Sequence, residues 1–442
     1  MIQILILLCF SPIAILPVLI LLRVQSEMRN HYLLVSVFTN ELFLIFIIGY
    51  KPAGVNDGGS IFANIIILYS SVLPLLVLLL TAPGRNKIIE GKRPSWSEEI
   101  LKFSWIVLLL MAFYAAALAK TKLLPISNVV IFSILVYLII QKSFNFEMLL
   151  VAIYRIFSLI GAALTFSFIF GFNWSALVIQ EIDPLNLDRN TYFSPLGALF
   201  GFAPRAYGPF GSGQVSGMFS VFGIACYLSS SNPKKTKYPM IALVAFGSCS
   251  GSRTFYLTLA SILLFRLVRK ILPKNMFAFW VTFPSISLGL GFFLFKYFLP
   301  LISPEKTTIT NLTGRSVLWK LILSDWSNQG LLGHGPNSLS QYTIEHLYQN
   351  YAHAHNSFLQ YLWDFGLVGI STFVFMILSV CIESSRFYVR RDQVFTLVLT
   401  LLCIESEPTL IIGMGVVSWF WLVPLTYVYS SDQKERAHSE QR

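Results

Sequence analysis

Long apolar runs recur along almost the whole chain, and they restrict its fold more than any other feature of the sequence. We find about thirteen such runs, and a membrane-spanning helix needs about 20 residues of this kind. Only 12% of the residues are charged, whereas soluble domains average about 25%. The sequence therefore predicts an all-α, polytopic membrane protein with about 12–13 transmembrane segments, in which residues 1–442 form a single integral membrane domain. The runs lie at residues 1–22, 32–49, 61–81, 102–119, 125–141, 149–171, 215–231, 238–249, 254–268, 276–299, 356–380, 395–405 and 413–430.

Lysine and arginine residues gather in the short loops between these runs. If the segments alternate in direction, all of these loops lie on one side, which the positive-inside rule makes cytoplasmic. The net charge of +11 is then a signal of topology, and we expect membrane lipids but no nucleic acid as partners. Two long gaps, 172–214 and 300–355, lie on the opposite side, facing the periplasm or the cell exterior. Reactions that use cytoplasmic nucleotide donors are thereby excluded.

The first outer gap offers one candidate for anion binding. It is rich in glycine, proline and aromatic residues, and its basic residues are Arg189 and Arg205. Such a loop is expected to lie on the membrane surface or to re-enter it. Arg205 is a candidate substrate-binding residue, although both arginines also suit contact with lipid phosphates.

Arg253 lies between two apolar runs, in the small-residue segment Ser248–Thr254. An arginine at a helix break near the membrane is costly and indicates function by default. The alternative is an interfacial arginine whose head group reaches water.

The second outer gap carries most of the chemistry-bearing residues. Arg315 precedes residues of helical periodicity, which predicts a short helix with this arginine in its first turn. Arginine opposes the helix dipole there, but its planar fork suits bidentate phosphate binding. Gly333 and Gly335 predict a tight turn that lets the backbone approach a ligand. His355 and Asn356 stand where this gap meets the next apolar run, which also fits an ordinary helix cap.

Metal binding is not indicated by the sequence. No CxxC pattern and no Cys/His zinc spacing occur, and the carboxylates of the outer gaps are scattered. Magnesium would require one or two carboxylates beside a phosphate. We therefore predict no metal and no cofactor, although folding can still bring Asp325 close to Glu345 or Asp364.

The order of these residues resembles that of the O-antigen ligase and O-antigen polymerase superfamily of integral membrane glycosyltransferases. The resemblance rests on His355-Asn356, nine residues, Gly366, two residues and Gly369. The other matching features are Gly314-Arg315 followed by Trp319, Gly333-x-Gly335, and Ser252-Arg253 as an arginine at an outer helix end. The similar part runs from about Gly201 to Gly369.

The resemblance implies an all-helical glycosyltransferase fold of the C type and a glycan donor on undecaprenyl pyrophosphate. Pyrophosphate is a good leaving group that needs positive charge where the anion develops, which Arg253 and Arg315 supply. The acceptor hydroxyl needs a base, for which neutral His355 is suited. These three are the catalytic candidates, and a single displacement would invert the anomeric centre. The candidates for substrate binding are Arg205, Gly333, Gly335 and Asn356.

Two products of such a transfer remain open. A polymerase of O-antigen, capsule or exopolysaccharide moves the growing chain onto a lipid-linked repeat unit, and a chain-length regulator is then a candidate partner. An O-antigen ligase moves the finished chain onto lipid A-core or another terminal acceptor. The long first outer gap favours the polymerase. Either enzyme would lie in the bacterial plasma (inner) membrane.

A lipid-linked sugar transporter or flippase is the alternative from another class. Transporters place polar residues near the bilayer midplane in several helices. Here the polar residues gather at one membrane face, and runs such as 61–81 contain no charge. This distribution favours an enzyme.

Overall fold

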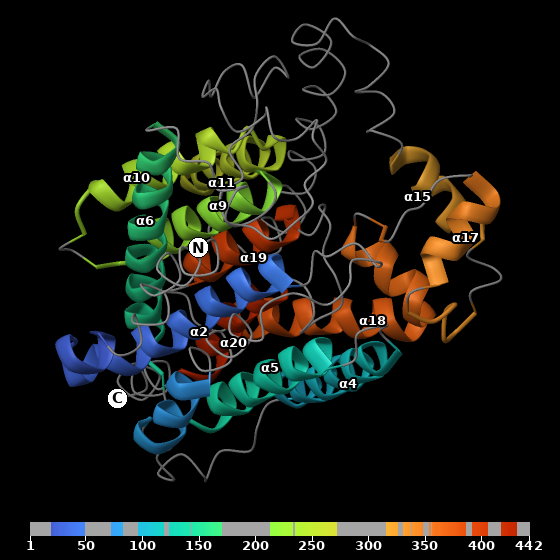
Figure 1. Ribbon diagram of the computed structural model, residues 1–442, viewed down its shortest axis with the longest axis horizontal. Coiled ribbons are helices and arrows are strands. Elements are labelled where there is room, and N and C mark those ends of the chain that lie inside the picture. Colours follow the sequence, from blue (N-terminus) through green and yellow to red (C-terminus); the bar gives the residue numbers. More distant parts are fainter. Residues whose placement is uncertain are drawn as a thin grey trace, which may run out of the picture.

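The computed structural model describes residues 19–48, 72–82, 96–118, 123–142, 144–169, 213–232, 235–271, 315–325, 330–336, 338–347, 353–354, 356–385, 391–404 and 417–430. Within these ranges the chain forms helices and turns and no β-strand, which confirms the all-α prediction (Figure 1). The principal elements are α2 (Ser26–Ile48), α4 (Trp96–Leu118), α5 (Leu123–Gln141), α6 (Phe146–Ile169), α9 (Gly213–Ser229), α10 (Tyr238–Cys249), α11 (Arg253–Ile271), α15 (Arg315–Ser324), α17 (Ser338–Leu347), α18 (Ser357–Ser385), α19 (Arg391–Ile404), the 3-10 helix η7 (Val417–Trp421) and α20 (Leu422–Tyr429).

Three of the described helices, α4, α6 and α18, are long and apolar enough to cross a membrane. Their outward faces are also apolar, since Phe103, Leu110 and Leu159 are each more than half exposed. Large exposed apolar side chains suit contact with lipid rather than with water. The chain is thus an all-α polytopic membrane protein. The predicted run at 276–299 lies outside the described residues, as do most of those at 1–22 and 61–81.

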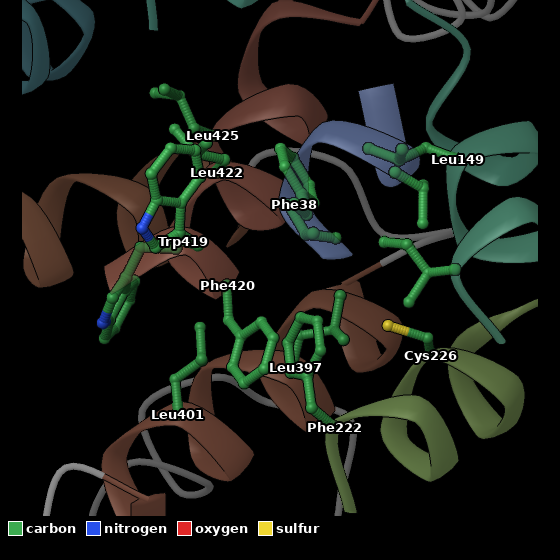
Figure 2. Packing of buried hydrophobic residues seen from close by; sticks show 14 of the residues in the cluster. Phe38, Leu149, Phe222, Cys226, Leu397, Leu401, Trp419, Phe420, Leu422 and Leu425 are labelled. Carbon is green, nitrogen blue, oxygen red and sulfur yellow. The ribbon is translucent and has the colours of Figure 1, made fainter. Parts of the chain in front are cut away.

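The centre of the main bundle is α9. It packs against α6, α10, α11 and α19, and almost all of its residues are buried. A helix that is apolar on every side must be covered on every side. Phe219 stacks on Phe157 of α6 at 3.8 Å between ring centroids, and Phe222 stacks on Phe420 of η7 at 4.1 Å. Figure 2 shows Phe222, Phe420 and Trp419 within this core.

Helix α18 connects this bundle to the candidate site. It packs along α4 and also contacts α19 and α20. At the junction of α4 and α18, the buried Ser97 hydroxyl donates a hydrogen bond to Glu383. The N-terminal part of α18 leads away from the bundle toward α15 and α17 (Figure 1).

Candidate active site

The described part of the second outer gap folds into a small cluster with a core of its own. Helices α15 and α17 lie beside the start of α18, to the right in Figure 1. We call this unit the satellite cluster. Its core consists of the buried residues Leu318, Ile322, Leu339, Ala354 and Trp363, with Trp319, Tyr342 and Leu359 packed against them.

Helix α15 begins at Arg315, as the sequence predicts. Leu318 and Ile322, four residues apart, are fully buried, whereas Val317 is about half exposed. This amphipathic face holds a helix of ten residues that would not persist alone in water. The backbone of Arg315 is therefore fixed at the helix N-terminus, while its side chain lies outside what the structure describes.

The predicted glycine turn is present. Gly333 and Gly335 have φ angles of +71° and +86°, values that side chains with a Cβ rarely adopt. Gly366 of α18 has φ +60° and ψ −148°, so the helix is broken there. A Cβ on Gly333 would lie 2.5 Å from the amide nitrogen of Gly366, and one on Gly366 would lie 2.6 Å from that of Gly333. At Gly333 the backbone thus closely approaches another part of the same chain, whereas nothing lies within 4 Å of a Cβ at Gly335; contact of either glycine with a ligand stays a prediction.

Backbone hydrogen bonds join this turn to both sides of the break. In a continuous helix the Val368 amide would donate to the Asp364 carbonyl. Instead, residues of the turn form a hydrogen bond with each of these two groups. The apolar run expected over 356–380 is thus present as α18, but the helix is broken at Gly366. The bonds are His334 N to Trp363 O (2.8 Å), Gly335 N to Asp364 O (3.1 Å) and Val368 N to Leu331 O (3.2 Å).

The segment beside His355 is held from α18. Asn356 Oδ1 accepts the Leu359 amide at 3.1 Å, so Asn356 is the N-cap of the helix. The Ala354 amide donates to Gln360 Oε1 at 2.7 Å, and Gln360 Nε2 donates to Asp364 Oδ2 at 2.9 Å. These bonds place the backbone on both sides of His355, which itself lies outside the described residues.

One polar pair of the satellite cluster was missed by the sequence reasoning. His334 Nε2 lies 2.6 Å from Asp325 Oδ2. Tyr342 also hydrogen-bonds Asp325, and its pKa is raised by burial and by the negative charge of that carboxylate. The nine-residue spacing of Asp325 and His334 fits no helix or strand period, so only the folded turn shows the contact.

Aromatic side chains such as Tyr342, Tyr348, Tyr351 and Trp363 suit either stacking on sugar rings or core packing. Trp363 is fully buried, and its ring lies 4.3 Å from that of His334. The Tyr342 ring stacks on His346 at 4.0 Å and lies 4.8 Å from Trp363. These contacts show core packing for Trp363 and Tyr342. Tyr348 and Tyr351 lie outside the described residues.

Arg253 is the first residue of α11, directly after a tight turn from α10. The turn contains Gly251 at φ +57°, and the Phe255 amide donates to Ser252 Oγ at 3.4 Å. A Cβ on Gly217 of α9 would lie 2.7 Å from Cβ of Ser252, so the turn is packed closely against α9. The backbone of Arg253 is thus fixed, while its side chain lies outside the described parts.

We predict that Arg253, Arg315 and His355 converge on one cavity, and this stays a prediction because none of these three side chains is among those described. Arg205 also lies outside the described ranges. Within those ranges, no group of three or more His, Cys, Asp or Glu side chains is arranged to hold a metal ion.

A comparison with protein families adds an independent finding. Residues 238–374 match the model of the O-antigen ligase family. The matched segment begins with α10 and ends within α18, so it contains Arg253, Arg315, His355 and the glycine contact, but not Arg205. The match confirms the predicted resemblance to the O-antigen ligase and polymerase superfamily. No curated protein matches the chain.

Proposed function

We propose, from the relationship of residues 238–374 to the O-antigen ligase family, that the protein transfers a glycan from undecaprenyl pyrophosphate to a sugar hydroxyl. The transfer takes place at the outer face of the bacterial plasma membrane. The leading form is a polymerase of a surface polysaccharide such as O-antigen, capsule or exopolysaccharide. The ligase is the second form, because the matching family is described as O-antigen ligase.

This proposal rests on the positions of the three catalytic candidates, which lie at or just before the N-terminal ends of helices. Arg253 and Arg315 are the first residues of α11 and α15, and His355 stands two residues before α18 begins. The first amides of a helix have no partner within it, and together with the helix dipole they favour a negative charge. Arginine at these positions is unfavourable for helix stability, which supports a role in binding an anion.

In the proposed reaction, the acceptor hydroxyl oxygen forms a bond to the anomeric carbon of the donor glycan. The bond from that carbon to the pyrophosphate oxygen breaks, and its electron pair leaves with undecaprenyl pyrophosphate. Arg253 and Arg315 bind the negative charge that develops on this oxygen, with Arg205 as a further ligand. Neutral His355 accepts the proton of the hydroxyl. One displacement inverts the anomeric centre, and no metal ion takes part.

The distinguishing experiment uses purified protein in liposomes with lipid-linked repeat units as the sole substrate. Growth of the glycan supports the polymerase. If the glycan grows only when lipid A-core is added, and is joined to it, the protein is a ligase. Translocation of the lipid-linked unit without a new glycosidic bond would instead show a transporter and would refute the proposal.

A further inference from the structure

The carboxylate of Asp325 joins two parts of the satellite cluster. It follows the last residue of α15 and binds His334 Nε2 at 2.6 Å and the hydroxyl of Tyr342. A carboxylate only accepts hydrogen bonds, so both partners donate to it. The Asp325 side chain is 10% exposed, and hydrogen bonds to a charged group are strong where water is largely excluded.

His334 provides a fixed support for this carboxylate. Its amide donates to the Trp363 carbonyl at 2.8 Å, and its ring lies 4.3 Å from the Trp363 ring. Trp363 in turn donates from Nε1 to Ser338 Oγ at 2.8 Å. The imidazole is therefore held by both the backbone and the core of the cluster. Asp325 is thus bound to a part of the structure that is fixed independently of α15.

Other described contacts of α15 come from the middle of the helix. Leu318 and Ile322 enter the satellite core, and Trp319 Nε1 donates to the Ala354 carbonyl at 2.8 Å. Ala354, which accepts the hydrogen bond from Trp319, is the residue next to His355. The direction of the helix thus depends on its middle, through Trp319, and on its end, through Asp325.

The length of α15 turns a small rotation at one end into a displacement at the other. Arg315 and Asp325 are separated by about 15 Å at a rise of 1.5 Å per residue. In enzymes a displacement of about 1 Å in a reacting group can lower the rate about 100-fold. Loss of the hydrogen bond between Asp325 and His334 would therefore displace Arg315.

We propose, resting on the function proposed above, that Asp325 and His334 are positioning residues for the glycan transfer. Their hydrogen bond fixes α15 against the break in α18. This contact holds Arg315 in place for the pyrophosphate and keeps Trp319 on the segment that carries His355. Neither residue of the pair needs to touch the substrate.

The test measures transfer by the full-length protein in liposomes, with kcat and KM determined separately. We expect Asp325→Ala to lower kcat roughly 10- to 100-fold while the KM for the acceptor is almost unchanged. Asp325→Asn retains one acceptor oxygen and should restore most of the rate, because a neutral hydrogen bond still forms. Glu345→Ala removes an exposed carboxylate of α17, bonded to Gln341, and serves as the matched control with unchanged kcat.

A double-substitution cycle separates positioning from general stability. If Asp325 acts through Arg315, Asp325→Ala combined with Arg315→Lys is hardly worse than Arg315→Lys alone. If Asp325 only stabilises the fold, the two losses in kcat multiply. His334→Ala removes the other partner of the contact and gives the same cycle, so the test remains decisive even when Asp325→Ala does not accumulate.

The outcomes distinguish this proposal from the proposed function. If Arg315→Lys lowers transfer but Asp325→Ala matches the Glu345→Ala control, the positioning role is refuted and the function stands. Multiplicative losses refute the positioning role in the same way. If Arg315→Lys transfers glycan normally, the pyrophosphate clamp fails, and the positioning role fails with it.

Discussion

Gly333 and Gly366 each occupy the space that a Cβ on the other would need. A Cβ at either residue would lie within 2.6 Å of the amide nitrogen of the other, and both residues have positive φ angles. The contact is between main chains, so no change of rotamer can relieve a clash. It fixes the turn of the satellite cluster to the break in α18.

Alanine at Gly333 or Gly366 should therefore destabilise the protein strongly. The left-handed conformation costs a residue with a Cβ roughly 1–2 kcal/mol, and overpacking adds about 1–3 kcal/mol. The free energy of unfolding in detergent, followed by denaturant titration, measures the loss. Gly335→Ala is the matched control, because its φ is also positive but nothing lies within 4 Å of its Cβ position. Equal losses at Gly333 and Gly335 would contradict the interlocked arrangement.

The imidazole of His355 should be essential for transfer. His355→Ala is expected to abolish glycan transfer in the liposome assay while the protein still inserts and accumulates, because the acceptor hydroxyl loses its base. His353→Ala, two residues away and half-buried, should have a mild effect. An active His355→Ala together with an inactive His353→Ala would show that the wrong imidazole had been assigned.

Gln360 should support the His355 segment through its side-chain amide. Gln360→Leu leaves the buried amide of Ala354 without its acceptor, which costs about 1–3 kcal/mol. We expect a lower kcat in the liposome assay and reduced stability. Gln341→Leu on α17 is the control, since Gln341 is exposed and bonds only to Glu345 among the contacts described. If both leucine variants behaved alike, Gln360 would have no special role.

Transfer should not require a divalent cation. Two or three arginines carry enough positive charge for a pyrophosphate, and they stay protonated at every physiological pH. We therefore expect full activity of the purified protein in excess chelator. Activity that disappears in chelator and returns with magnesium or manganese would rule out an arginine-only site.

Local sequence patterns predicted the elements whose formation depends on nearby residues. The spacing of Leu318 and Ile322 located α15, and the two glycines of 333–335 located the turn. The short run at 238–249 matches α10 residue for residue. In each case the information lies within one helical period or one turn, so it can be read from a short window of the chain.

Contacts between distant segments were not visible in the sequence. Gly366 lies in an apolar run, and glycine in such a run does not reveal that a turn more than 30 residues earlier will dock on it. The contact of Asp325 with His334 was not predicted for the same reason, because it depends on where the turn places the imidazole. The resemblance included Gly366 but gave no physical account of it, which the positive φ angle now supplies.

The docked turn also implies an order of assembly. Residues 330–336 leave the ribosome before α18 is complete, and a segment can enter the bilayer only when its backbone groups have partners. A straight α18 satisfies its own amides, whereas the broken helix relies on the turn for the carbonyls of Trp363 and Asp364 and for the amide of Val368. We therefore expect α18 to enter the bilayer unbroken and to break at Gly366 when the turn docks on it. On this reasoning, docking of the turn is a separate folding step that follows the insertion of α18.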